Sequence, residues 1–105
     1  MAFTGASLAD GQIAATETDV YAVPSGKKAI VRSFHVFNTG AGSETVKVYV
    51  RRNGGTSRQF AIAVLAQNES AQFIDTPMTL SSEDAFRALT TSALNVDYII
   101  TGATE

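Results

Sequence analysis

The sequence contains no cysteine and no tryptophan, and it has a single histidine, His35. The lack of cysteine excludes disulfide bonds, thiolate metal sites and cysteine nucleophiles. One histidine cannot build a multi-histidine metal site within one chain, and we expect neither a metal nor another cofactor. His35 lies inside a predicted strand, where a structural role is favoured over a catalytic one, while a role at an interface or as a pH sensor stays open.

Long apolar runs are also lacking. No stretch approaches the roughly 20 apolar residues that a membrane-spanning helix requires. Residues 1–10 have neither the basic start nor the apolar centre of a signal peptide. We therefore expect no membrane contact and no secretion. The length of 105 residues and the apolar fraction of 45% predict one folded domain with a single core.

Recognisable catalytic motifs are absent as well. The sequence has no Gly-x-Gly-x-x-Gly, no Walker-type phosphate loop, no His-Glu-x-x-His and no Gly-x-Ser-x-Gly. The adjacent acids Glu83 and Asp84 have the chemistry of a glycoside hydrolase pair, but two acids at a predicted turn are usually solvated. We predict that the protein is not an enzyme. The rival interpretation requires a concave pocket that converges on His35 or on an acid pair.

The net charge of −2 conceals an asymmetry along the chain. Residues 27–58 contain seven of the eight basic residues and one acid, a net charge of +6, whereas the remainder carries one base and nine acids, a net charge of −8. A nucleic-acid-binding domain would show a basic surplus throughout, so we expect no nucleic-acid partner. The two segments either neutralise each other across neighbouring strands, which we favour, or form complementary patches that join copies head to tail.

Residues 21–38 form the most informative stretch, YAVPSGKKAIVRSFHVFN. Pro24 suits the second position of a turn, and Gly26 supplies the positive φ of a type II turn. The residues that follow are rich in Val, Ile and Phe, which favour a strand. Strict alternation places Ile30, Phe34 and Val36 on one face and Val31, His35 and Phe37 on the other. Both faces are therefore expected to be covered, one by a neighbouring subunit or a loop, unless single apolar residues are simply exposed.

The same patterns predict the other strands. They are expected at residues 12–15, 18–23, 44–52, 57–65, 70–75, 78–80 and 95–101. Asn53-Gly54-Gly55 predicts a hairpin turn whose two central positions have positive φ. Val46, Val48 and Val50 are expected to share the buried face of one strand, and Phe60, Ile62 and Val64 lie in register along the return strand. Val96, Tyr98 and Ile100 are expected to face inward.

Residues 82–94 allow two interpretations. Ser81 and Asp84 could cap a helix, or they could form a turn before a strand at residues 85–90, which we favour. Seven to nine short strands with regular turns predict an all-β fold, an antiparallel β-sandwich of the jelly-roll or Greek-key kind. Residues 1–11 are expected to form an N-terminal arm, and residues 12–105 a single sandwich domain that ends in a short tail from residue 102.

Five segments of the sequence resemble a class of small tailed-bacteriophage virion proteins. They are YAVPSGKKAIVRSFHVFNTG, ETVKVYVRR, LAQNESAQF, MTLSSEDAFRA and NVDYIITG, and together they span most of residues 20–102. In that class a VPxGK turn precedes a long AIVRSxHVxN strand, and LxxGEx and TLxxGDxxRA turns precede a closing VDxxISG strand. Asn68 and Glu83 stand where the class commonly has glycine, which leaves the type of those two turns open.

The resemblance implies a β-sandwich that assembles on a virus particle without catalysis. It implies a capsid decoration (cement) protein of the virion, made in the cytoplasm of the host bacterium. Phage capsid or tail proteins and further copies of the chain would be its partners. The alternative is a tail or fibre component, including a receptor- or carbohydrate-binding domain with Tyr21, Tyr49 or Tyr98 exposed in a groove.

Interface residues are predicted on the second face of the long strand, on the arm and around the hairpin tip. The candidates are Phe3, Leu8, Val31, His35, Phe37, Tyr49, Arg51, Arg52 and Arg58. The three arginines near the hairpin tip are either ordinary solvated residues, which we favour, or a site for a phosphate or an acidic partner.

Overall fold

The computed structural model describes residues 4–74, 76–92 and 95–104. These residues form nine β-strands in two antiparallel sheets. The strands are β1 (Thr4–Gln12), β2 (Thr18–Ala22), β3 (Ala29–Asn38), β4 (Glu44–Arg51), β5 (Ser57–Leu65), β6 (Ser70–Gln72), β7 (Met78–Leu80), β8 (Ala85–Thr90) and β9 (Val96–Thr104). The described part of the chain contains no helix, and so none that could cross a membrane.

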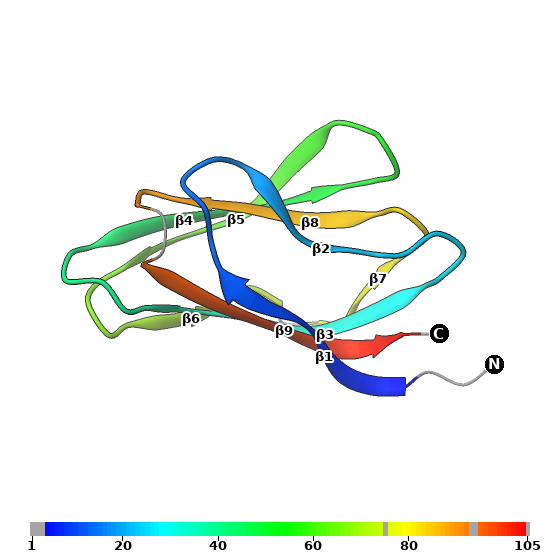
Figure 1. Ribbon diagram of the computed structural model, residues 1–105, viewed down its shortest axis with the longest axis horizontal. Helices are drawn as coiled ribbons and strands as arrows, with labels where there is room; N and C mark the ends of the chain where they lie inside the picture. Colours follow the sequence, from blue (N-terminus) through cyan, green and yellow to red (C-terminus); the bar gives the residue numbers. More distant parts are fainter. Residues whose placement is uncertain (1–3, 75, 93–94, 105) are drawn as a thin grey trace.

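The two sheets lie one above the other as separate layers (Figure 1). Sheet A has the order β1-β9-β3-β6, with β7 also paired to β3, and sheet B has the order β2-β8-β4-β5. β6 pairs with residues 35–37 of β3, and β7 pairs with residues 29–31. β6 and β7 are therefore two pieces of one interrupted edge strand beside β3.

The strand pairing is that of one long hairpin folded over on itself. β1 pairs with β9, and β2 pairs with β8. β3 pairs with β6 and β7, which together act as one strand, and β4 pairs with β5. A hairpin rolled up in this way makes a double-sheet jelly roll. The predicted antiparallel sandwich of the jelly-roll or Greek-key kind is confirmed, and residues 85–90 form a strand.

The core lies between the sheets and consists of inward side chains from both. Phe34 of β3 and Phe86 of β8 are fully buried, and their ring centroids lie 5.7 Å apart in an edge-to-face contact. Phe34 meets Phe73 in the same way. Each such contact adds about 0.5–1.5 kcal/mol beyond the burial of apolar area. Other fully buried side chains are Ile13, Val31, Val36, Val46, Val48, Leu80, Val96 and Ile100.

A β-bulge in β3 changes which of its side chains face the core. The register between β3 and β9 shifts between Val31 and Ser33, so Val31 and Phe34 both point inward. Val31 is 0% exposed. The prediction that Val31 shares an outer, interface-forming face with His35 and Phe37 is therefore wrong, because strict alternation ignores the extra residue of a bulge. His35 and Phe37 do face outward.

A second bulge, between β4 and β5, has the same effect. The register shifts between Val48 and Tyr49 and leaves Phe60 as the extra residue of β5. Phe60 packs against the core, whereas Ile62 and Val64 point outward and are 57% and 66% exposed. Phe60, Ile62 and Val64, which stand in register in the sequence, therefore do not share one face.

The two ends of the described chain form neighbouring strands. β1 pairs with β9 from Thr4↔Thr104 to Gln12↔Asp97. The stretch expected to be an arm, residues 1–11, is thus part of an edge strand from Thr4 onward, and the expected tail continues β9 as far as Thr104. The small residues of the N-terminal stretch carry little strand propensity. The hydrogen bonds to β9 supply what propensity does not.

Two predicted turns form, but their positions differ from expectation. The N–H of Lys27 donates to the carbonyl oxygen of Pro24 at 3.1 Å. Pro24 is therefore the first residue of the turn, and Gly26, with a φ of 79°, is the third. In the hairpin turn that starts at Arg52, only Gly54 of the two central residues has a positive φ, 73°. A positive φ at the third position alone is the pattern of a type II turn.

Candidate functional site

The residues predicted to form an interface are spread over several places. His35 and Phe37 lie on the outer face of sheet A, Tyr49 and Arg51 on the outer face of sheet B, Arg52 and Arg58 around the β4–β5 hairpin, and Leu8 and Val31 against or inside the core. Phe3 is outside the described residues. The described candidates do not share one surface. The structure shows instead two exposed apolar patches on opposite faces.

The first patch lies on the outer face of sheet A and is called here the acidic patch. Its members are Phe37, Ile99, His35, Asp10 and Asp97. Phe37 and Ile99 are 40% and 51% exposed. Across the strands, Ile99 stands between His35 and Asp10, and Asp97 stands opposite Phe37. Phe37 and Ile99 are therefore diagonal neighbours, about 7–8 Å apart. The predicted inward set Val96, Tyr98 and Ile100 already implies that Ile99 points outward.

The second patch lies on the outer face of sheet B and is called here the basic patch. Its members are Ile62 and Val64 of β5, Lys47 of β4 and Leu89 of β8. Lys47 stands opposite Ile62 on one side and opposite Leu89 on the other. Sequence reasoning missed this patch, because the bulge at β5 turns Ile62 and Val64 away from the face of Phe60.

The ion pairs leave most of the basic segment uncompensated. Among residues 4–74, 76–92 and 95–104, Arg52 is the one member of the 27–58 basic segment that forms an ion pair, 2.9 Å from Asp84. Two further acids, Glu17 and Asp19, lie 3.2 and 3.1 Å from Arg87 instead. Within the described residues, ion pairing of the kind that the sequence favours therefore accounts for one of the seven basic residues.

Asp84 fastens the tip of the β4–β5 hairpin to the loop before β8. Its side chain is 5% exposed and accepts hydrogen bonds from Arg52 Nη1 at 2.9 Å and from the backbone N–H groups of Asn53 and Ser81 at 3.0 and 2.9 Å. Burial alone would raise the pKa of Asp84, but these donors outweigh burial and hold the pKa below its usual value. Arg52 is thus engaged in a structural contact.

His35 is exposed on the outer face of sheet A. Its Nε2 atom is 2.8 Å from Oε1 of Gln72 on the neighbouring strand. A carboxamide can orient the ring, but it provides no negative charge to stabilise an imidazolium, as the carboxylate of a catalytic triad does. In the part of the chain that the structure describes, no three His, Asp or Glu side chains are placed to hold a metal ion.

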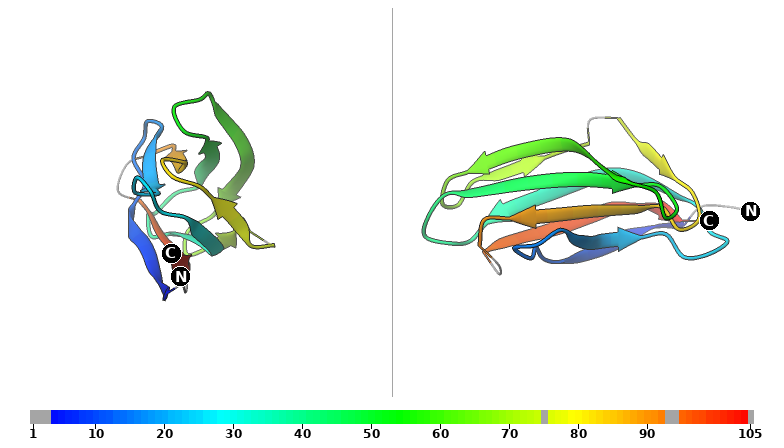
Figure 2. Two further views of the ribbon diagram at one scale, coloured as in Figure 1. Left: turned by 90° about the vertical axis from the view of Figure 1, so that its right-hand side faces the viewer. Right: turned by 90° about the horizontal axis from the view of Figure 1, so that it is seen from above.

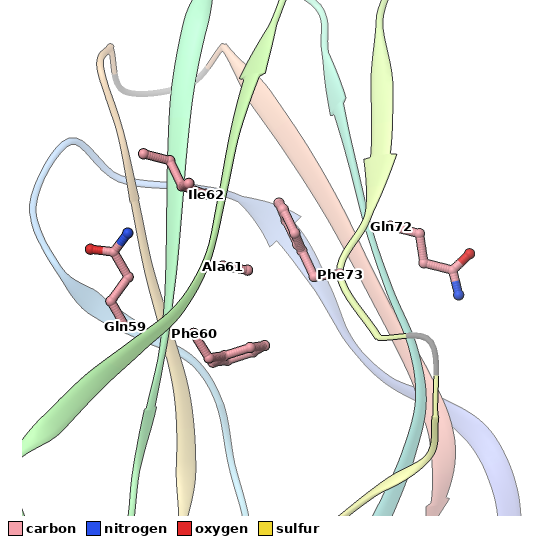
Figure 3. A pocket seen from close by; sticks show the side chains of 6 residues that line it. All are labelled: Gln59, Phe60, Ala61, Ile62, Gln72 and Phe73. Atoms are coloured by element: carbon pink, nitrogen blue, oxygen red, sulfur yellow. The ribbon is translucent and has the colours of Figure 1, made fainter.

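An open groove of about 510 Å³ runs along one side of the sandwich, between β5 and the end of β6. It is lined by Gln59, Phe60, Ala61, Ile62, Gln72 and Phe73. Figure 3 shows Phe60, Ala61 and Phe73 turned toward one another across the gap, while Gln72 points away from it. The side chains that meet across the groove are therefore apolar, and its two glutamines do not converge to fix a bound ligand.

The three tyrosines do not form an exposed cluster. Tyr21 and Tyr98 are half-buried against the core, where the hydroxyl of Tyr98 donates to the carbonyl oxygen of Val20 at 3.1 Å. Burial raises the pKa of both phenols. Tyr49 lies on the outer face of sheet B, in β4. The tyrosine-lined groove expected of a carbohydrate-binding domain is not formed by these residues.

One similar solved structure comes from Bacillus, in work that describes endospore appendages as a novel family of disulfide-linked pili. The alignment has a TM-score of 0.55 and 23% sequence identity, and it covers 97% of this chain and 86% of that chain. At this identity the similarity establishes the shared β fold and nothing further. No family model and no curated protein matches the sequence.

Proposed function

We propose that this protein is a non-catalytic structural subunit that acts by associating with further copies of itself. The observation that carries the proposal is the presence of exposed apolar side chains on both outer faces of the sandwich, Phe37 and Ile99 on sheet A and Ile62 and Val64 on sheet B. Neighbouring apolar side chains that remain exposed mark interaction sites. Two such sites give each subunit two neighbours.

The molecule has room for two separate contacts. A standard interface takes about 800 Å² from each partner, which is roughly one seventh of the total accessible surface of 5593 Å². The patches belong to different layers of the sandwich, whose outer faces point in opposite directions (Figure 2). A neighbour on one face would therefore leave the other face free.

The similar structure supports the proposal that this protein acts in an assembly of many copies. The endospore appendages are disulfide-linked pili, whereas the present chain has no cysteine. Disulfide linkage between copies is therefore closed to this chain, and non-covalent contacts must hold its copies together. Interfaces of that kind need an apolar centre and a polar rim, which both patches provide.

The specific assembly that we propose is the particle of a tailed bacteriophage, on which the protein acts as a capsid decoration protein. The support comes from the sequence motifs and from two turns. Asn68 and Glu83, which replace the glycines common in the phage class, have positive φ values of 62° and 65°. Both turns thus keep the backbone conformation that glycine favours. A tail or fibre component with the same motifs is the second candidate.

Two measurements test these proposals separately. Sedimentation velocity over a wide concentration range should show reversible growth beyond the monomer, and a chain that stays monomeric throughout would contradict the structural role. Mass spectrometry of purified phage particles, calibrated against the major shell protein, tests the location. Hundreds of copies support decoration, a few to a few dozen support a tail or fibre role, and absence from particles refutes the virion assignment.

A further inference from the structure

We infer that copies of this protein join head to tail, with the acidic patch of one copy seated on the basic patch of the next. The inference rests on the proposed function, because it identifies the two surfaces of that self-association. The occupant of each patch is a second copy of this chain.

Each patch has two exposed apolar side chains at its centre. Phe37 and Ile99 form one centre, and Ile62 and Val64 form the other, with exposed fractions between 40% and 66%. Leu89 extends the second centre across Lys47 to the third strand. Each centre lies on regular sheet, so two copies can stack face to face without rearranging a loop.

The rim of the first patch is acidic. Asp97 stands opposite Phe37, and Asp10 stands opposite Ile99. Neither carboxylate forms an ion pair within the described ranges. Arg32, the basic residue of β3, lies toward the other end of that strand from Phe37. The charge beside this apolar centre is therefore negative and open to a partner.

The rim of the second patch is basic. Lys47 lies within it, and Arg51 follows on the same face of β4. Neither side chain forms an ion pair with any residue that the structure describes. Of the acids in this layer, Glu17 and Asp19 lie on the β2 side and face Arg87, whereas Glu44 of β4 is buried and accepts hydrogen bonds from Thr90 and Ser92. They do not neutralise the charge beside Ile62.

Charge decides which faces meet. Two acidic patches face to face would bring the aspartates of both copies together. Two basic patches face to face would bring together the Lys47 side chains of both copies. Juxtaposed like charges are costly at an interface, whereas opposite charges steer and align the partners. The contact is therefore heterologous, and it repeats from copy to copy until a ring closes or a filament forms.

A mixing experiment with two patch variants of the full chain tests the inference. The variant Phe37→Thr with Ile99→Thr removes the apolar centre of the acidic patch, and Ile62→Thr with Val64→Thr removes the apolar centre of the basic patch. All four side chains are exposed, and threonine suits strands, so both variants should keep the far-UV circular dichroism and unfolding midpoint of the wild type. Each variant alone should remain monomeric, and an equimolar mixture should form a one-to-one dimer and nothing larger.

Every other result overturns the inference, and the results separate it from the proposed function. A dimer formed by one variant alone indicates contact between like patches. If both variants form oligomers on their own, other surfaces mediate the association. In both cases the inference fails while self-association stands. A wild-type chain that remains monomeric at the highest concentration refutes the inference and the proposed function together.

Charge variants give an independent readout. Lys47→Glu reverses the charge beside Ile62 and should weaken self-association severalfold or more. Adding Asp97→Lys to the same chain should recover much of the loss, because positions 47 and 97 again carry opposite charges. Raising the salt concentration should weaken wild-type association, since exposed charges are screened. A double variant no stronger than Lys47→Glu alone would contradict the predicted pairing of the rims.

Discussion

Two non-glycine residues hold turns in the left-handed region of the backbone. Asn68 lies in the turn that Glu69 N–H closes by donating to the carbonyl oxygen of Ala66, and Glu83 lies in the turn that Asp84 N–H closes by donating to Ser81. For most residues with a Cβ atom this conformation costs about 1–2 kcal/mol, whereas asparagine tolerates it better. Glu83 is thus the more strained of the two.

The variant Glu83→Gly should raise the free energy of unfolding by about 0.5–1 kcal/mol. Relief of the left-handed strain exceeds the added entropy of the unfolded chain, which costs about 0.4–1 kcal/mol. Asn68→Gly should gain less. Denaturant unfolding measures the differences, with Gln67→Gly as the control at a turn position without positive φ. A loss at Glu83→Gly as large as the loss at Gln67→Gly would contradict the interpretation.

Gly102 is required for a different reason, the close approach of two strands. A Cβ atom at this position would overlap the carbonyl oxygen of Ile30, beside the bulge of β3. Gly102→Ala should therefore lower the free energy of unfolding by about 2–3 kcal/mol, because the backbone must move. Gly42→Ala is the matched control, since nothing lies within 4 Å of its Cβ position. Equal thermal unfolding midpoints for the two variants would refute the argument.

At the scale of elements, strand positions could be predicted from sequence more easily than strand faces. Residues 57–65 and 85–90 were expected as strands and match β5 and β8, because apolar alternation between polar turns is a local signal. The bulges at Arg32 and Phe60 leave no comparable signal, since one inserted residue changes no composition. Each bulge nevertheless reverses the faces beyond it. This is why alternation places Val31 outside, and why it places Ile62 on the same face as Phe60.

The link between the β4–β5 hairpin and the loop before β8 should be sensitive to acid. The pKa of Asp84 is depressed in the folded state by Ser81, Arg52 and Asn53. The carboxylate therefore contributes stability that is present above its unfolded pKa of about 3.9 and is lost as the pH falls through the lower folded pKa.

Asp84→Asn should lower the free energy of unfolding at neutral pH by about 2–3 kcal/mol, because it removes the charge of a buried, multiply bonded group. It should also flatten the fall in stability below pH 4. Denaturant unfolding at a series of pH values measures both effects. Asp97→Asn is the control, because this carboxylate forms no ion pair within the described residues. A variant with the wild-type pH profile would show that another group controls acid unfolding.

At the scale of the whole molecule, the pairing of distant strands determines which outward side chains lie side by side, and the sequence pattern does not reveal this. Alternation alone places His35 and Phe37 outward, and it implies the same for Ile99. Their combination with Asp10 into one patch depends on β1 lying beside β9, a contact between the two ends of the chain. Local propensity carries no information about such pairing, and small residues made the first strand resemble an arm.

Removal of residues 1–12 should therefore cost about 4 kcal/mol or more of unfolding free energy. The deletion leaves the edge of β9 without its partner, where each hydrogen bond contributes about 0.5–1.5 kcal/mol, and it removes Leu8 and Ala9 from the core surface. A circular permutant is the control: its ends are joined by a short Gly/Ser linker and reopened at residues 40–42. It keeps every strand, and Thr4 and Thr104 are already neighbours, so its stability should stay close to that of the wild type. Denaturant unfolding compares the two proteins. If the deletion variant is as stable as the permutant, the first strand is an arm after all. A deletion variant that unfolds while the permutant stays folded establishes β1 as part of the sandwich.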